Sequence, residues 1–139
     1  MDDRLPSVSE TGTIASIVPD VVPPNIAGFT IGELLGHGGM GVVWRATQVY
    51  PEREVALKVM NASALASETA RARFRTEVEV ATRLEHANIA RVYNCSLNQP
   101  PYYFTMELIK GRRLDKYVED ENLNPRQVAT LMYAVCMGV

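Results

Sequence analysis

The stretch "LLGHGGMGVVWRA", residues 34–46, contains four glycines within six positions and then continues directly into Val-Val-Trp. Since β-branched and aromatic residues favour strands, the residues after Gly41 predict a strand rather than a helix. We therefore expect the glycines to form the tip of a β-hairpin. Glycine has no side chain that would keep charged oxygens away from backbone N–H groups, so such a tip could bind phosphate. An ordinary hairpin is the alternative, and it accounts for one or two glycines better than for four.

The composition limits the class of protein. The chain has 139 residues, of which 47% are hydrophobic and 22% charged, and its formal net charge is −2. These values are typical of one globular domain or a part of one, and they indicate no basic face for nucleic acid. No run is apolar enough to span a bilayer, and the acidic start is unlike a secretory signal, so we expect a cytoplasmic protein. Cys95 and Cys136 lack metal-site spacing and are expected to be buried, reduced thiols.

Short hydrophobic runs around the glycine stretch predict a sheet. Residues 29–36, 41–49 and 54–60 are rich in β-branched and aromatic residues and are separated by turn signals, which favours an antiparallel meander. Residues 89–97 and 102–109 predict two further strands, joined by the turn "NQPP". The sequence therefore predicts five strands.

The longest helix prediction of the first half is residues 67–85, which contain neither Gly nor Pro. Phe74, Val78 and Ala81 recur there at helical spacing, and Ser67 stands at the N-cap position.

Two more helices are predicted towards the C-terminal end. The first covers residues 112–120, and the second covers 124–139 with Asn124 as N-cap and Pro125 at its first position. An apolar stripe on the second is formed by Val128, Leu131, Met132 and Val135. Strands and helices together predict an α+β fold.

A Gly-x-Gly-x-x-Gly pattern, here Gly36, Gly38 and Gly41, occurs in dinucleotide-binding folds as well as in protein kinases. A helix begins at the third glycine of the dinucleotide-binding fold, whereas a strand is predicted here. Lys58 follows within an apolar strand, and Glu77 follows midway along the predicted helix, where an inward carboxylate would need a cation. This order argues against a dinucleotide-binding oxidoreductase.

Four stretches in order, "LLGHGGMGVVWRA", "VALKVM", "FRTEVEVATRLEHANIARVY" and "YYFTMELIKGRRLDKYV", resemble the beginning of a eukaryotic-like Ser/Thr protein kinase of the bacterial type. The resemblance covers residues 28–139. It implies a five-stranded antiparallel sheet with one helix packed on it, followed by a hinge and two helices of a truncated large lobe. The implied division is a flexible, proline-containing leader at 1–27, the kinase N-terminal lobe at 28–107, and the hinge with the first helices of an incomplete C-terminal lobe at 108–139.

The resemblance also implies which residues bind ATP. Lys58 would hold the α and β phosphates, and Glu77 would hold Lys58 in the active arrangement, so these two are the catalytic candidates. Met106 falls at the gatekeeper position beside the adenine. The remaining residues would cover the phosphates, contact the adenine or supply the hinge backbone that hydrogen-bonds it: Leu35, Gly36, Gly38, Gly41, Val43, Ala56, Glu107 and Ile109.

Later motifs of the kinase family are not found in this sequence. They are His-Arg-Asp, Asp-Phe-Gly and Ala-Pro-Glu, which supply the catalytic base, the Mg²⁺ ligands and the peptide platform. We therefore assign no metal ligand, and we expect weak ATP binding and no phosphoryl transfer to a protein substrate by this chain alone. The apolar stripe of the last helix is expected to be exposed and to favour self-association. Two functions stay open: the ATP-binding portion of a Ser/Thr protein kinase domain, or a catalytically inactive kinase-like module that docks to a partner.

Overall fold

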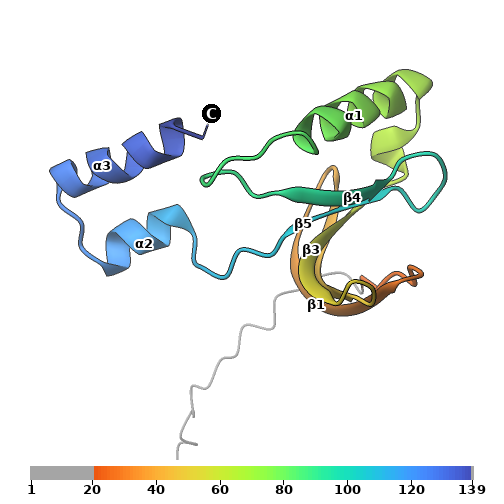
Figure 1. Ribbon diagram of the computed structural model, residues 1–139, viewed down its shortest axis with the longest axis horizontal. Coiled ribbons are helices and arrows are strands. Elements are labelled where there is room, and N and C mark those ends of the chain that lie inside the picture. The colour runs from red at the N-terminus through yellow and green to blue at the C-terminus, as the bar shows by residue number, and fades with distance from the viewer. Residues whose placement is uncertain (1–20, 139) are drawn as a thin grey trace, which may run out of the picture.

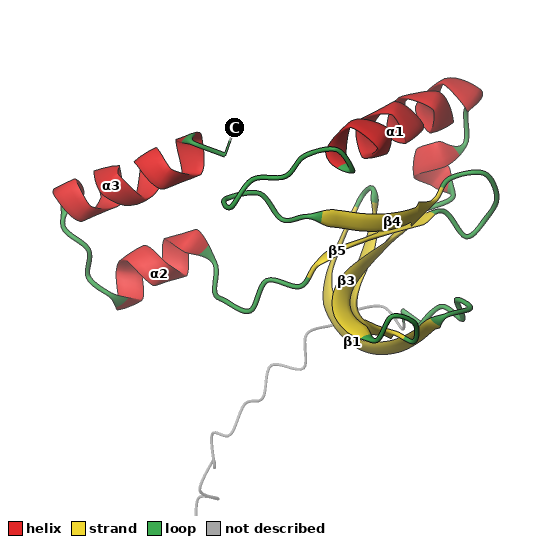
Figure 2. Ribbon diagram, viewed as in Figure 1, coloured by secondary structure: helices red, strands yellow, loops and turns green. Residues whose placement is uncertain are grey.

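The computed structural model describes residues 21–138, so most of the predicted leader, residues 1–20, lies outside the described residues. The strands form one antiparallel sheet in the order β1-β2-β3-β5-β4. Three α-helices and a short 3₁₀ helix, η1, lie outside it (Figure 1, Figure 2). The predicted α+β class is therefore confirmed. In chain order the elements are β1 (Phe29–Gly38), β2 (Gly41–Gln48), β3 (Arg53–Met60), η1 (Ser63–Leu65), α1 (Glu68–Ala81), β4 (Val92–Ser96), β5 (Tyr103–Glu107), α2 (Leu114–Asp120) and α3 (Pro125–Cys136).

One face of the sheet carries the hydrophobic core. Successive side chains of a strand point to opposite faces, and Val55 and Leu57 of β3 are both fully buried against Trp44 and Ala46 of β2. Ile26 belongs to the same cluster and is 5% exposed, although it lies within the predicted leader. The packed part of the chain therefore includes residues before Gly28.

The opposite face of the sheet carries the predicted binding residues. Cross-strand partners in an antiparallel sheet share a face, and Lys58 is the partner of Val43 in β2 and of Phe104 in β5. Ala56, two residues before Lys58, is paired with Met106. The register therefore places Val43, Ala56, Lys58 and Met106 together on the face opposite the core.

Helix α1 lies beside the sheet (Figure 1) and buries one residue. Its predicted N-cap is confirmed, because the Ser67 hydroxyl accepts a 3.1 Å hydrogen bond from the Ala70 amide. Val78 is its one buried residue, and the Phe74 ring lies 6.1 Å from the Phe104 ring, centroid to centroid. The helix ends at Ala81, earlier than predicted, because the next residues turn back on themselves with bonds from Arg83 N to Val80 O and from Leu84 N to Ala81 O.

Helices α2 and α3 follow the hinge and lie apart from the sheet in Figure 1. The predicted N-cap of α3 is confirmed: Asn124 Oδ1 accepts from the Gln127 amide, and Gln127 Oε1 accepts from the Asn124 amide. No residue of α3 is buried, and for that reason the prediction of a buried Cys136 is wrong. Asn88 Nδ2, in the loop after α1, donates to Ala134 O at 2.6 Å and connects α3 to the rest of the chain. Within residues 21–138, no helix is both long enough and apolar enough to cross a bilayer.

Candidate functional site

The glycine-rich stretch forms the tip of the β1–β2 hairpin, as predicted. Gly38 and Gly41 are the last paired residues, and Gly39 and Met40 make the turn between them. Because β2 begins at Gly41, no helix starts there, and the dinucleotide-binding alternative is excluded. A pocket of about 380 Å³ lies at the tip and is lined by Gly36, His37, Gly38, Gly39, Met40, Gly41, Val43 and Lys58.

Only one of these glycines is required by close packing within the hairpin. A Cβ on Gly41 would lie 2.3 Å from the carbonyl oxygen of Val59 on β3, which is closer than atoms can approach. At Gly36 and Gly38 a Cβ would meet nothing within 4 Å. Close packing therefore explains why position 41 is a glycine. It does not explain Gly36 and Gly38, where the open space beside the backbone could be occupied by a bound group.

Lys58 extends into the same pocket from β3. Its side chain is half-buried, and its Nζ lies 5.8 Å from the centroid of the Phe104 ring, within the range of a cation–π contact. None of the ion pairs between described residues includes Lys58. A cation without an acidic partner among the described residues, next to glycines with open space beside them, suits the binding of an anion.

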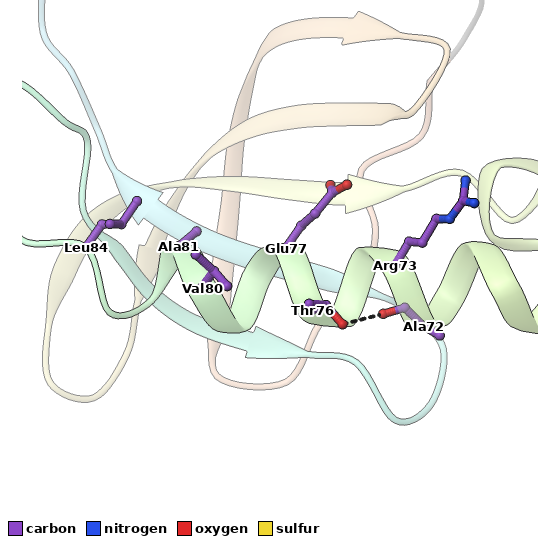
Figure 3. A pocket seen from close by; sticks show the side chains of 7 residues that line it. All are labelled: Ala72, Arg73, Thr76, Glu77, Val80, Ala81 and Leu84. Atoms are coloured by element: carbon purple, nitrogen blue, oxygen red, sulfur yellow. Dashed lines mark hydrogen bonds between the residues drawn. The ribbon is translucent and has the colours of Figure 1, made fainter. Parts of the chain in front are cut away.

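Glu77 lies elsewhere, on the exposed side of α1. It lines a separate groove, and in Figure 3 its carboxylate and the Arg73 side chain project from the same side of the helix. No ion pair between described residues includes Glu77, so the structure does not join it to Lys58. Phe104 lies near both elements, because its ring is close to the Lys58 ammonium and also to the ring of Phe74, which precedes Glu77 on α1 by about one helical turn. The groove is lined by Ala72, Arg73, Thr76, Glu77, Val80, Ala81 and Leu84.

The predicted hinge lines a second pocket, of about 250 Å³, beside β1. Within residues 21–138, the amide and carbonyl of Ile109 form no hydrogen bond, which leaves both free for a ligand. The Glu107 amide donates to Arg91 O at 2.8 Å, so a contribution of Glu107 to a ligand must come from its carbonyl. The pocket is lined by Glu33, Leu35, Arg45, Leu108, Ile109, Lys110 and Gly111.

Charged side chains connect this hinge to the sheet, a feature that the sequence analysis missed. Glu54 on β3 accepts from Arg45 Nη2 at 2.5 Å and from Lys110 Nζ at 2.7 Å, and Arg45 also contacts Glu33. The hydrogen bond from Lys110, followed by that from Arg45, lowers the pKa of the Glu54 carboxyl below its ordinary value. The same carboxylates raise the pKa of Arg45. Alternating charges on neighbouring strands were the only signal of this network in the sequence.

The residues that the structure describes contain no group of three or more His, Cys, Asp or Glu side chains that could hold a metal ion.

The comparisons with known proteins agree with the resemblance noted above. The family of the protein kinase domain matches residues 29–139. The serine/threonine-protein kinase PrkC of Bacillus subtilis is 29% identical over 112 residues, which are 80% of this chain and 17% of the relative. The serine/threonine-protein kinase PknB of Mycobacterium leprae is 30% identical over 123 residues, which are 84% of this chain and 20% of the relative. The chain thus spans about a fifth or less of the length of these relatives.

Proposed function

The chain belongs to the protein kinase family, and from that premise we propose that it is the ATP-binding portion of a Ser/Thr protein kinase domain. In this proposal residues 28–107 are the N-terminal lobe, and 108–139 are the hinge and the first helices of the C-terminal lobe. The protein substrate that the family phosphorylates would be bound by parts outside this sequence. Self-association through α3 has no support in the structure or the comparisons.

The observation that carries the proposal is the arrangement of two pockets on one side of the sheet. The glycine-rich tip and Lys58 line the first pocket, and the unbonded backbone of Ile109 lines the second. The register places Val43, Ala56 and Met106 on the face that carries Lys58. An elongated ligand with a flat apolar base and an anionic tail fits this order, with its base at the hinge and its phosphates at the glycines.

Each end of the site supplies different interactions. At the hinge, the Ile109 backbone and the Glu107 carbonyl would hydrogen-bond the adenine edge, and Leu35 and Ala56 would pack against the ring. At the tip, the N–H groups and the Lys58 ammonium would hold the phosphates, because charge-assisted hydrogen bonds to phosphate are strong. Mg²⁺, when bound in the family, neutralises phosphate charge; the family's ligands for it come from motifs absent here.

We assign Glu77 the role of holding Lys58 in the active arrangement. This role requires α1 to bring the carboxylate to the ammonium, which the structure does not show. Such an adjustment is supported by the small contact of α1 with the sheet, through Val78 and Phe74. An exposed ion pair contributes little by itself, so the pair would form when bound phosphates and the rest of the domain exclude water.

Lys58→Ala tests the proposal. We expect Mg-ATP to bind weakly to this chain, and the variant to weaken binding by about tenfold or more, because a hydrogen bond to a charged group contributes more than a neutral one. The measurement is an NMR titration of backbone amides with Mg-ATP, with Lys116→Ala as matched control. Lys116 is exposed on α2, where it pairs with Glu119.

Equal affinities of the unaltered chain and the Lys58→Ala variant would contradict the proposal. So would shifts confined to α3 on addition of nucleotide. A chain that binds no nucleotide at all would favour the alternative, a kinase-like module that acts by docking to a partner.

A further inference from the structure

Asn61, the residue directly after β3, is hydrogen-bonded to the glycine-rich tip three times. Its side-chain Nδ2 lies 3.3 Å from Gly38 O and 3.2 Å from Gly39 O. Its backbone amide donates to Met40 O at 3.0 Å. Three consecutive carbonyls of the tip are therefore held by the one residue that follows β3.

Asn61 is itself fixed in place. The preceding amide, of Met60, donates to Tyr102 O at 2.9 Å, and the Asn61 carbonyl accepts from the Ala64 amide at 3.1 Å, in the turn that begins η1. With the backbone held on both sides, the side chain is presented to the tip from a rigid base.

The three bonds determine where the N–H groups of the tip point. In a planar trans peptide, the C=O and the following N–H point in opposite directions. When Asn61 holds Gly38 O and Gly39 O, the amides of Gly39 and Met40 must point away from it. Within residues 21–138 neither of these two amides donates a hydrogen bond. Asn61 is also absent from the lining of the pocket at the tip, which Gly39, Met40 and Lys58 share.

We propose that Asn61 is a positioning residue that holds the glycine-rich tip by its carbonyls and so directs the amides of Gly39 and Met40 towards the phosphates of a bound nucleotide. This inference rests on the proposed ATP-binding function. Adjacent N–H groups that point to one side form a concave site for anions, and a tip oriented before binding loses less conformational freedom when phosphate binds. Asn61 acts through the backbone and does not touch the ligand.

Two variants of Asn61 separate this role from a general contribution to folding. Asn61→Ala removes the side-chain donor, and Asn61→Asp keeps the shape but places an acceptor against the carbonyls. The matched control is Asn98→Ala, because Asn98 is exposed in the loop between β4 and β5 and its side chain forms no hydrogen bond with described residues. The ligands are ATP and adenosine, which share the base and differ in the phosphates, and both are titrated against the whole chain by NMR.

We expect Asn61→Ala to weaken ATP binding by about tenfold, the loss of two ordinary hydrogen bonds that orient the tip. Asn61→Asp should weaken it further, because its negative charge lies near the phosphates. Adenosine affinity should not change in either variant. In the absence of ligand, the amide of residue 61, which donates to Met40 O, should be less protected from hydrogen exchange in both variants than in the control.

Equal losses of ATP and adenosine affinity would overturn the inference, since they would indicate damage to the whole site. Unchanged ATP affinity with unchanged exchange would overturn it as well. If the unaltered chain binds neither ligand, the proposed function fails and the phosphate-directing role falls with it. Faster exchange in the Asn61 variants would then still support the hydrogen bonds by which Asn61 holds the tip, so the two failures can be told apart.

Discussion

At Gly41 the absence of a side chain is a requirement of the sheet, whereas at Gly38 it is not. An alanine Cβ at position 41 would overlap the Val59 carbonyl oxygen, a backbone atom that cannot move without disturbing the β2–β3 ladder. We expect Gly41→Ala to lower the free energy of unfolding by about 1–3 kcal/mol, the usual effect of overpacking.

Gly38→Ala is the matched variant, because a Cβ there meets nothing within 4 Å. It should change the free energy of unfolding by about 0.5 kcal/mol or less but should weaken ATP binding, since the added methyl stands where phosphate approaches. Urea denaturation and an ATP titration of both variants check this pair. Loss of stability in Gly38→Ala, or none in Gly41→Ala, would show that the glycines have other roles.

The same residues show what the sequence could and could not predict at a site. Gly41, Lys58 and the cap residue Ser67 have local signatures, because spacing, strand composition and hydroxyl chemistry are read along the chain. Asn61 has none. An asparagine after a strand signals only a turn, and its bonds to Gly38 and Gly39 depend on a pairing of strands that sequence order does not specify.

At the scale of elements, the network around Glu54 ties the hinge to three strands. Glu33 lies on β1, Arg45 on β2 and Glu54 on β3, while Lys110 belongs to the hinge. The pKa of Glu54 is lowered, so the network contributes stability above the ordinary carboxyl pKa and loses it as the pH falls through the pKa of the folded state. Acid should therefore loosen the hinge while the apolar core stays intact.

Lys110→Ala tests whether the network around Glu54 holds the hinge against the sheet. Because the hydrogen bond from Lys110 is the largest cause of the lowered Glu54 pKa, the variant should raise that pKa towards its ordinary value. An NMR pH titration of the Glu54 side chain measures this effect, with Lys116→Ala as control. An unaltered Glu54 pKa in Lys110→Ala would mean that the contact does not persist in solution.

The elements themselves were largely predictable, and their ends were not. Each of the five strands and three α-helices has a strong pattern in the sequence, and the sheet follows from alternation. The helix predicted over 67–85 was too long because no Gly or Pro in the sequence marks its end. The helix ends at Ala81 because the residues that follow form i→i−3 hydrogen bonds in place of the helical i→i−4 bonds. The strand order was not predictable beyond β3, since β5 pairs with β3 and leaves β4 at the edge.

At the scale of the whole molecule, the described chain has a packed part and a weakly attached part. The core lies between β1, β2 and β3 and the residues before them, with Leu57 fully buried and the single Trp44 4% exposed. Helices α2 and α3 contain no buried residue. The Asn88 side chain donates to Ala134 O of α3 and so links this helix to the loop before β4. Hydrophobic burial supplies most of the cooperativity of folding, so the sheet should unfold as a unit without requiring the C-terminal helices.

Leu57→Ala and Leu131→Ala test this division. Removing the buried Leu57 side chain should lower the free energy of unfolding of the sheet by about 2–5 kcal/mol, because it leaves a cavity beside Trp44. Leu131 is half-buried on α3, and its removal should move the sheet transition by about 0.5 kcal/mol or less. Trp44 fluorescence in urea reports on the sheet alone, because it is the chain's single tryptophan, and far-ultraviolet circular dichroism reports on the helices. If Leu131→Ala shifted the Trp44 transition as far as Leu57→Ala, the helices would belong to the same cooperative unit as the sheet.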